Sequence, residues 1–313
     1  MSDIKVFKLT SDAPQEMQGS SVALEKSLQN LIEQNMETFL GVRFLATEYY
    51  TGRVHNGYID SLGIDENGCP VIIEYKRSLN ENVINQGLYY LDWLMDHKAE
   101  FELLVMKQHG KEASENIEWP SPRLLCIAGD FTRYDEHAVQ QINRNIELIR
   151  YRKYGSELLL LELVNAITAT TVPTGTGLTK RPPAPKPTTP PTKGQYKTVT
   201  EYQEQASDQL RDLFGALKDY LLALGDDVQI KTLKYYFAFK RIKNFACVEI
   251  HPWYERLVVF VKVDPDTVEV KEGFTRDVRN VGHFGTGDLQ IFIKTMDDLE
   301  AVKPLLLKSY ENS

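Results

Sequence analysis

Three charged side chains in YIDSLGIDENGCPVIIEYKRS, residues 58–78, stand where they could do chemistry. The apolar run at 71–73 predicts a buried strand, and it leads directly into Glu74 and Lys76. Because side chains alternate along a strand, Glu74 and Lys76 point to the same side. Asp60 lies on the preceding strand, and a short hairpin turn would bring its carboxylate near that of Glu74.

Two carboxylates beside an ammonium group are suited to holding a divalent cation and a water molecule. Neighbouring carboxylates repel each other unless a cation intervenes, and oxygen ligands of this kind suit Mg²⁺ or Mn²⁺. Lys76 could hold or activate water, or steady a phosphoryl oxygen. The simpler alternative is a salt bridge between Glu74 and Lys76 at a strand end, since Glu-x-Lys is a common tripeptide.

Three further residues extend this candidate site. Glu25 lies beside the apolar stripe of the first predicted helix. It does not fit a capping box with Ser21, which would need the acid at position 24. Gln86 and Tyr90 are four residues apart on the helix that follows Glu74, so they share one face of that helix.

Alternating helices and strands must position these residues. The turn signal Asn67-Gly68 joins strands predicted over 57–63 and 70–76. Asp65, the nearest rival to Asp60, precedes this turn, where Asp commonly makes local hydrogen bonds, so Asp60 is preferred. The remaining pattern predicts helices over 21–34, 81–96, 98–109 and 134–143, an extended segment over 44–50, and strands over 123–129, 146–154 and 157–164. This order predicts an α/β domain with a mixed sheet flanked by helices.

A segment rich in Pro, Thr and Gly separates two parts of the chain. Residues 171–198 contain no large aliphatic cluster and only positive charges, which predicts an extended, partly polyproline linker. The predicted organisation is therefore a first domain over 1–170, this linker, and a second domain over 199–313.

The second domain is predicted to be a smaller α+β unit with an antiparallel sheet. The pattern predicts a helix over 202–224, strands over 234–242, 245–252, 256–263 and 289–294, and a closing helix over 297–312 that Pro304 breaks or kinks. Basic and aromatic residues interleave over 231–263; we favour strands with aromatics inward and lysines outward over a nucleic-acid surface. The glycine-rich segment 282–290 is interpreted as a connection rather than a phosphate loop.

The order of the candidate residues resembles that of the PD-(D/E)xK nuclease superfamily. Glu25 in a helix, Asp60 in GYID, Glu74-Tyr75-Lys76 and then Gln86-xxx-Tyr90 follow the expected succession. Gln-xxx-Tyr after the Glu-x-Lys strand is typical of RecB-like members, and the flanking segments resemble the NucS-type branch. The resemblance covers roughly residues 20–168. Over about 205–313 the chain resembles an uncharacterised domain labelled "predicted transport protein".

The resemblance implies a restriction-endonuclease-like fold and an Mg²⁺- or Mn²⁺-dependent endonuclease acting on DNA, in repair or in defence against foreign DNA. It implies that Asp60 and Glu74, with Glu25 as a further ligand, hold the metal, and that Lys76 orients the attacking water. Gln86 would then position Lys76 or a phosphate. The expected nucleic-acid contacts are Tyr90, Arg53 and Arg77.

One departure from the family pattern bears on activity. Ile59 replaces the usual Pro before the first Asp, although many RecB-like members also lack this Pro. The alternative is a catalytically inactive nucleic-acid-binding or scaffold protein with a nuclease fold. A third possibility is a regulator or transport-associated protein in which the motif is coincidental.

The composition restricts the cellular location of the protein more than it restricts the kind of partner that the protein binds. The 313 residues carry a net charge of −8, but an acidic nuclease remains possible because a bound metal supplies positive charge locally. No apolar run approaches the roughly 18–20 residues of a membrane span, and the N-terminus has no signal-peptide core. Three widely separated cysteines, Cys69, Cys126 and Cys247, predict reduced thiols in a cytoplasmic protein. A homodimer and a protein partner of the second domain are both plausible.

Overall fold

The computed structural model describes residues 4–10, 13–21, 25–76, 83–167 and 196–313. The chain divides into two compact units, Met1–Thr170 and Thr171–Ser313. Most of the predicted linker, residues 171–195, lies outside the described residues, as does the predicted nucleic-acid contact Arg77.

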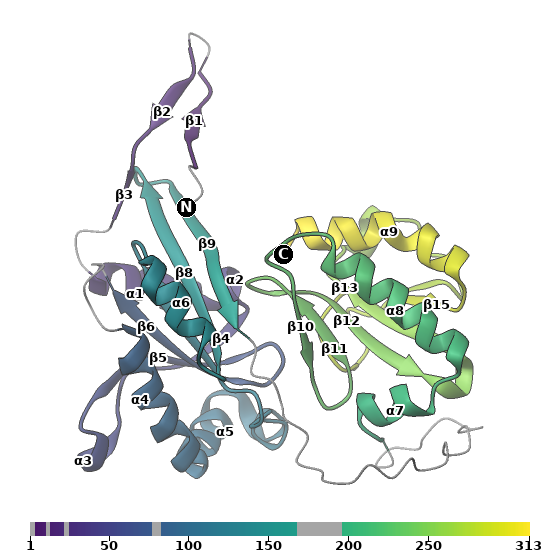
Figure 1. The fold of residues 1–313 in the computed structure, drawn as a ribbon, viewed down its shortest axis with the longest axis horizontal. Coiled ribbons are helices and arrows are strands. Elements are labelled where there is room, and N and C mark those ends of the chain that lie inside the picture. Colours follow the sequence, from purple (N-terminus) through teal and green to yellow (C-terminus); the bar gives the residue numbers. More distant parts are fainter. Residues whose placement is uncertain (1–3, 11–12, 22–24, 77–82, 168–195) are drawn as a thin grey trace. The chain divides into compact units, whose positions relative to one another are not determined.

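A seven-stranded mixed sheet forms the centre of the first unit (Figure 1). Its order is β3-β8-β7-β6-β5-β4, and β9 pairs with β8. The pairs β6–β7 and β7–β8 are parallel, and the other pairs are antiparallel. The strands are β3 (Gly19–Ser20), β4 (Val42–Tyr50), β5 (Tyr58–Asp65), β6 (Pro70–Lys76), β7 (Arg123–Ala128), β8 (Asn145–Tyr154) and β9 (Leu158–Ile167).

The hairpin β5–β6 forms where its turn signal predicts it. Gly68 adopts a φ of 79°, a left-handed conformation that glycine accepts without steric cost. Asp65 accepts hydrogen bonds from the amides of Asn67 and Cys69 at 2.9 and 2.8 Å. Its other oxygen binds Arg123 at 2.8 Å, within a buried cluster that includes Glu147. Asp65 therefore makes the local hydrogen bonds that are expected of an Asp before this turn.

Most helices of this unit bury apolar residues against the sheet, whereas the short α3 has no buried residue. In the first unit they are α1 (Glu25–Gln34), α2 (Met36–Leu40), α3 (Gly52–His55), α4 (Val83–Asp96), α5 (Lys98–Glu115) and α6 (Arg133–Gln140). The helix α4 connects the parallel strands β6 and β7 and contacts both. Leu91, Trp93 and Leu94 place its apolar face in the core. The helix predicted to end at 109 does end there, because Gly110 has a non-helical φ of 86°; a second helical segment then completes α5 to Glu115.

A small hairpin precedes this unit's main sheet and was not predicted. It consists of β1 (Val6–Lys8) and β2 (Gln15–Met17), paired antiparallel as a separate two-stranded sheet. Its short strands are too polar and too irregular in pattern to have given a strand signal.

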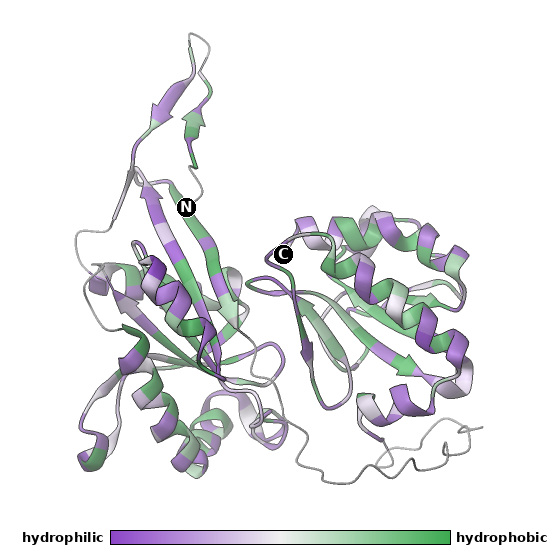
Figure 2. Cartoon of the chain, in the orientation of Figure 1, coloured by the Kyte–Doolittle hydropathy of each residue, from purple (hydrophilic) through white to green (hydrophobic). Residues whose placement is uncertain are grey.

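A six-stranded antiparallel sheet forms the second unit, with the order β10-β11-β12-β13-β15-β14. The strands are β10 (Gln229–Thr232), β11 (Phe237–Lys240), β12 (Asn244–His251), β13 (Arg256–Val261), β14 (Thr275–Asp277) and β15 (Leu289–Ile293). The helices are α7 (Val199–Gln205), α8 (Asp208–Leu222) and α9 (Met296–Glu311), with short 3-10 turns η1 (Pro252–Tyr254) and η2 (Pro265–Thr267). Figure 2 shows apolar strands under helices that carry both apolar and polar stripes.

The structure contradicts one helix prediction for this unit and one part of another, the break at Pro304. The helix expected over 202–224 is two helices, because Ala206 is extended and Ser207 caps α8 by accepting from the amide of Leu210. The helix α9 continues through Pro304 as one element. The short strands β10 and β14 were not predicted.

Aromatic residues of β11 and β12 point inward, as expected, and two lysines of β10 and β11 lie on the opposite face of the sheet. Phe237, Phe239 and Phe245 are buried in the core. Lys231 pairs with Ala238, and Lys240 follows Phe239, so both lie on the face away from the phenylalanines, although they are only 5% and 3% exposed. Within the described parts of the chain, none of the helices combines the length and apolar composition that a bilayer crossing requires.

Candidate active site

Asp60 and Glu74 come together across the hairpin β5–β6. Ser61 pairs with Ile73, so the next positions along the two strands, Asp60 and Glu74, face each other. The amide of Asp60 donates to Glu74 Oε1 at 3.3 Å, and the amide of Tyr75 donates to Asp60 Oδ2 at 2.9 Å. The carboxylates predicted to share one site therefore converge at the end of a buried strand pair.

Burial strongly affects the protonation of both carboxyl groups. Desolvation raises the pKa of Asp60 to about 6; the amide of Tyr75 and the charge of Lys76 oppose this shift. The pKa of Glu74 is raised well above its ordinary value, mainly by desolvation and secondly by the charge of Asp60. Each group is thus costly to ionise beside the other, which is the electrostatic condition that a bound cation relieves.

The residues present fit a divalent cation. Glu74 is 0% exposed, and its Oε2 has no hydrogen-bond partner among the described residues. That oxygen and the Asp60 carboxylate are hard oxygen donors of the kind that Mg²⁺ and Mn²⁺ prefer. Across the described residues, no three His, Cys, Asp or Glu side chains gather closely enough to hold an ion. A cation here would therefore use one or two carboxylates together with water or phosphate oxygens, as Mg²⁺ commonly does.

Lys76 lies at the end of β6 with its ammonium group directed to α1. Its Nζ is 3.4 Å from Oε1 of Glu25, the first residue of that helix. The Lys76 side chain is 16% exposed and that of Glu25 is 34% exposed, so the pair borders solvent. Glu25, predicted as a further metal ligand, is placed here as the partner of Lys76. Its charge also contributes to the raised pKa of Asp60.

A buried amide on α1 supports the site and was missed by sequence reasoning. Gln29 is 4% exposed and donates to the backbone carbonyl of Asp60 at 2.6 Å. On the same face of α1, Glu33 accepts from the hydroxyl of Ser61 at 2.6 Å. The signal was present, because Glu25, Gln29 and Glu33 are spaced by four residues along one helix face.

Gln86 and Tyr90 lie on α4 and support the start of β5. The amide of Gln86 donates to the Tyr90 hydroxyl at 3.4 Å, and that hydroxyl accepts from the amide of Tyr58 at 3.2 Å. Tyr90 is 6% exposed and packs in the core, where its hydroxyl joins α4 to β5. A Cβ at Gly57 would lie 2.5 Å from the Tyr90 oxygen, so only glycine fits there.

Glu48 is a fourth acidic residue at the site, and sequence reasoning missed it. Thr47 pairs with Ser61 and Tyr49 with Ile59, which places Glu48 opposite Asp60 in the β4–β5 register. Its charge raises the pKa of both Asp60 and Glu74. Its φ is 47°, and a non-glycine residue in this region is a mark of a strained, often functional, position. No spacing could have identified it, because the register depends on a bulge between Phe44 and Ala46.

Arg53, the remaining described candidate for nucleic-acid contact, lies on the short helix α3 between β4 and β5 and is exposed. It stands on the connection that leads into the strand of Asp60. Arg77, immediately after Lys76, lies outside the described residues.

Known proteins are similar to the second unit alone or to the whole chain. Residues 199–313 match the family described as a domain of unknown function (DUF5655). An "Uncharacterized protein" of Haemophilus influenzae is 25% identical over 319 residues, covering 99% of this chain and 100% of that protein. The similarity to that relative extends through both units, and neither description names an activity.

Two solved structures are similar to part of the chain. A repair endonuclease from Pyrococcus abyssi is 19% identical, with a TM-score of 0.28, over 42% of this chain and 49% of that one. A structure described as an EndoMS-dsDNA2 complex is 18% identical, with a TM-score of 0.24, over 44% and 50%. The chain thus spans about half the length of these structures. TM-scores below 0.5 do not establish a common fold, so neither similarity bears on function here.

Proposed function

We propose that the first unit is a divalent-cation-dependent endonuclease that hydrolyses phosphodiester bonds of DNA. The observation that carries the proposal is the buried Oε2 of Glu74, which lacks a hydrogen-bond partner among the described residues and lies beside the Asp60 carboxylate. Such an arrangement destabilises the folded protein unless it binds something positive. Lys76 Nζ lies 3.4 Å from Oε1 of Glu25, and its charge opposes the raised pKa of Glu74.

The proposed roles follow from where each group lies. Asp60 and Glu74 would hold the cation through carboxylate oxygens. When bound, the ion would lower the pKa of a water molecule and stabilise negative charge on phosphate oxygens. Lys76 can donate three hydrogen bonds from the rim of the site, which suits it to orient that water or to bind a phosphoryl oxygen. Glu25 fixes the direction of the Lys76 side chain.

The succession of residues that resembles PD-(D/E)xK nucleases also supports the proposal. Glu25 and Lys76 are 51 positions apart in the chain, yet their charged groups meet at the site. Asp60 and Glu74 converge on it from neighbouring strands. Residues that belong to the motif by their order in the sequence thus also lie near one another in space.

The test is cleavage of a closed circular DNA, because nicking of a circle reports an internal cut. We expect the full chain to nick the circle with Mg²⁺ or Mn²⁺ and not with EDTA. Glu74→Gln and Asp60→Asn should abolish nicking. The matched control is Asp92→Asn on α4, whose carboxylate is 77% exposed and lies outside the site. A Glu74→Gln variant as active as the wild type would overturn the assigned site.

The same experiment separates the non-catalytic alternative. If neither wild type nor variants cut DNA, but all bind it equally in a filter or anisotropy assay, the first unit is a nucleic-acid-binding or scaffold domain. If there is neither cleavage nor binding, both readings fail.

A further inference from the structure

The strand β9 forms an edge of the first unit's sheet, beside β8 (Figure 1). It pairs with β8 over residues 158–167, and among the described residues no other strand or backbone group bonds to its outer side. Along an antiparallel strand, N–H and C=O groups point alternately to the two sides. About half of the backbone groups of this ten-residue strand are therefore unpaired, which makes it a template for another strand.

The other edge strands of the two large sheets carry features that hinder such pairing. The strand β4 contains charged residues and a bulge between Phe44 and Ala46, and His109 Nε2 lies 3.1 Å from the carbonyl oxygen of Phe44. The strands β3, β10 and β14 have only two, four and three residues. By contrast, β9 contains neither Lys, Arg nor Pro, and five of its first six residues are leucines. Charged, bulged or very short edges resist edge-to-edge pairing, so β9 is the edge most open to it.

The regular part of β9, Leu158–Leu163, is apolar and carries one charge. After it the register with β8 shifts, which marks a bulge. Its one charged residue is Glu162, whose carboxylate accepts from Arg150 at 2.8 Å. Leu158 is 46% exposed, and the side chains from 159 to 163 are partly exposed. The outer side of β9 thus suits an apolar strand that adds no unpaired charge, and a second copy of β9 is such a strand.

Two copies of β9 can pair antiparallel around a two-fold axis perpendicular to the sheet. Side chains alternate along a strand, and opposed side chains of an antiparallel pair lie on the same face. One residue at the axis must therefore face its own copy. An axis at Glu162 would oppose two like charges, which is destabilising, and an axis near either end of the run pairs fewer residues. The residues left for the axis are Leu160 and Leu161.

Charges across the joined sheet favour the axis at Leu161. On β8, Arg152 pairs with Leu160; it is exposed and has no ion pair among the described residues. The axis at Leu161 puts Leu160 opposite the second copy's Glu162. Arg152 of each copy then lies in one row with Glu162 of the other, whereas an axis at Leu160 would put the two copies of Arg152 in one row. Tyr151 pairs with Leu161, so the central row of the opposite face is apolar, with two leucines between two tyrosines.

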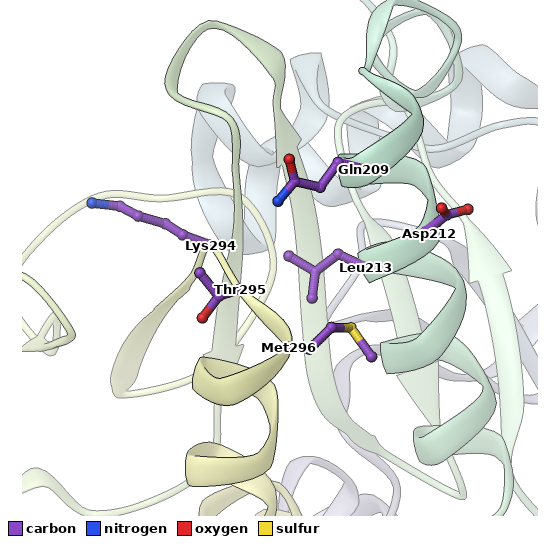
Figure 3. Close-up of a pocket in the computed structure, with 6 residues that line it drawn as sticks. All are labelled: Gln209, Asp212, Leu213, Lys294, Thr295 and Met296. Carbon is purple, nitrogen blue, oxygen red and sulfur yellow. The ribbon is translucent and has the colours of Figure 1, made fainter.

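A hollow of the second unit is a weaker candidate for a binding site. It has a volume of about 340 Å³. Figure 3 shows it between the first turns of α8 and α9, lined by Gln209, Asp212, Leu213, Lys294, Thr295 and Met296. Lys294 extends away from the other residues, and Asp212 adds a negative charge beside two helix N-termini that favour anions. Nothing in it points to a particular ligand.

We propose that the chain forms a homodimer in which β9 pairs antiparallel with β9 of a second copy, around a two-fold axis at Leu161. The seven-stranded sheets of the two copies then form one continuous sheet. The dimer is independent of the proposed nuclease activity, because no residue of β9 belongs to the candidate active site.

Disulfide cross-linking of the full chain tests the axis. Opposed residues of an antiparallel pair have Cα atoms about 4.5–5.5 Å apart, within the range that a disulfide spans. We expect Leu161→Cys to give covalent dimers under mild oxidation. The matched control is Leu158→Cys on the same strand, whose two copies would lie roughly 20 Å apart and should not link. The wild type should not link either, because its three cysteines are buried.

The mass in solution tests the dimer itself. By light scattering, the wild type should have twice the 35.8 kDa of one chain. Leu161→Lys and Leu161→Glu should each raise the dissociation constant of the dimer roughly 100-fold or more, because like charges meet at the axis. A one-to-one mixture of the two variants should restore the dimer, since opposite charges then meet. This rescue also shows that both variants fold.

A control at the opposite edge of the sheet identifies β9 as the interface. Phe44→Lys on β4, at a 37% exposed position, should remain dimeric. A wild type with the mass of one chain at tens of micromolar concentration would overturn the proposal and leave the edge of β9 to a strand of another protein. A dimer that Leu161→Cys does not cross-link, or that both charged variants retain, would place the interface elsewhere and overturn it too. So would a mixture of the charged variants that stays as single chains.

Discussion

The carboxylates of Asp60 and Glu74 each accept a hydrogen bond from a backbone amide of the other's strand, while their negative charges repel each other. The Asp60 amide donates to Glu74 Oε1 at 3.3 Å, and Oδ2 of Asp60 accepts from the amide that follows Glu74 at 2.9 Å. Both pKa values are nevertheless raised, because burial outweighs these two bonds. The backbone thus holds together two carboxylates that would separate if they were free to do so, and their repulsion makes the site's stability depend on protons and cations.

The first prediction concerns pH. The pKa of Asp60 rises from 3.8 to about 6 in the folded protein, so the folded state holds this proton more tightly than the unfolded state. The stability that Asp60 contributes is therefore complete below pH 3.8 and is lost as pH rises to about 6. In EDTA at pH 7 we expect Asp60→Asn to be more stable than the wild type by on the order of 3 kcal/mol.

Thermal unfolding of both proteins between pH 4 and pH 8 measures this difference. The stability gap should grow between about pH 4 and pH 6 and then level off. Asp92→Asn, made at an exposed carboxylate, should follow the wild type throughout. A gap that shrinks with rising pH would show that the Asp60 carboxylate is stabilised rather than destabilised by its surroundings.

The second prediction concerns cations. Mg²⁺ or Mn²⁺ should raise the unfolding temperature of the wild type, because a ligand that binds only the folded state stabilises it, by about 2.7 kcal/mol at 100 times Kd. Glu74→Gln should lose most of this shift, since the amide supplies no charge to the ion. Ca²⁺ and Na⁺ at matched ionic strength separate site binding from screening. An equal shift in Glu74→Gln would place the ion elsewhere.

The hairpin that carries the site could be predicted from sequence because its signals are local. The turn at Asn67-Gly68 and the apolar run before Glu74 fix which residues pair, and the order of strands and helices fixes the mixed sheet. Glu48 could not be found in this way, because it reaches Asp60 only through a bulged strand whose register is a tertiary property.

The third prediction separates two roles of Glu25. Its carboxylate is 3.4 Å from Lys76 Nζ, so we expect it to orient Lys76 rather than to hold the ion. Glu25→Gln should keep the full cation-induced rise in unfolding temperature while slowing DNA nicking about tenfold. Lys76→Met should also keep that rise but lose roughly 100-fold or more in rate. Loss of the cation effect in Glu25→Gln would instead make Glu25 a metal ligand.

The fourth prediction uses the backbone of Glu48. With a φ of 47°, this residue stands in the left-handed region, which costs a side chain on the order of 1 kcal/mol and costs glycine little. Glu48→Gly should therefore be more stable than Glu48→Ala by about 1 kcal/mol, although both lose the same carboxylate. The ion pair with Lys26 joins two half-exposed side chains and contributes little. Equal stabilities in urea unfolding would mean that this backbone is not strained.

The last prediction concerns the contact that sets the start of β5. A methyl group at Gly57 would lie 2.5 Å from the Tyr90 hydroxyl oxygen and 2.8 Å from a ring carbon. Gly57→Ala should therefore cost about 1–3 kcal/mol through overpacking. Gly215→Ala, inside α8 with nothing within 4 Å of the added carbon, should instead stabilise by about 0.5–1 kcal/mol.

A second substitution tests the cause of that loss. Tyr90→Phe removes the nearest atom, so the double variant Gly57→Ala/Tyr90→Phe should recover part of the stability lost by Gly57→Ala alone. The hydroxyl also accepts from the amide of Tyr58, two residues before Asp60, so Tyr90→Phe alone should slow DNA nicking. If the double variant is no more stable than Gly57→Ala, the overpacking lies elsewhere and Tyr90 does not fix the approach of β5 to the site.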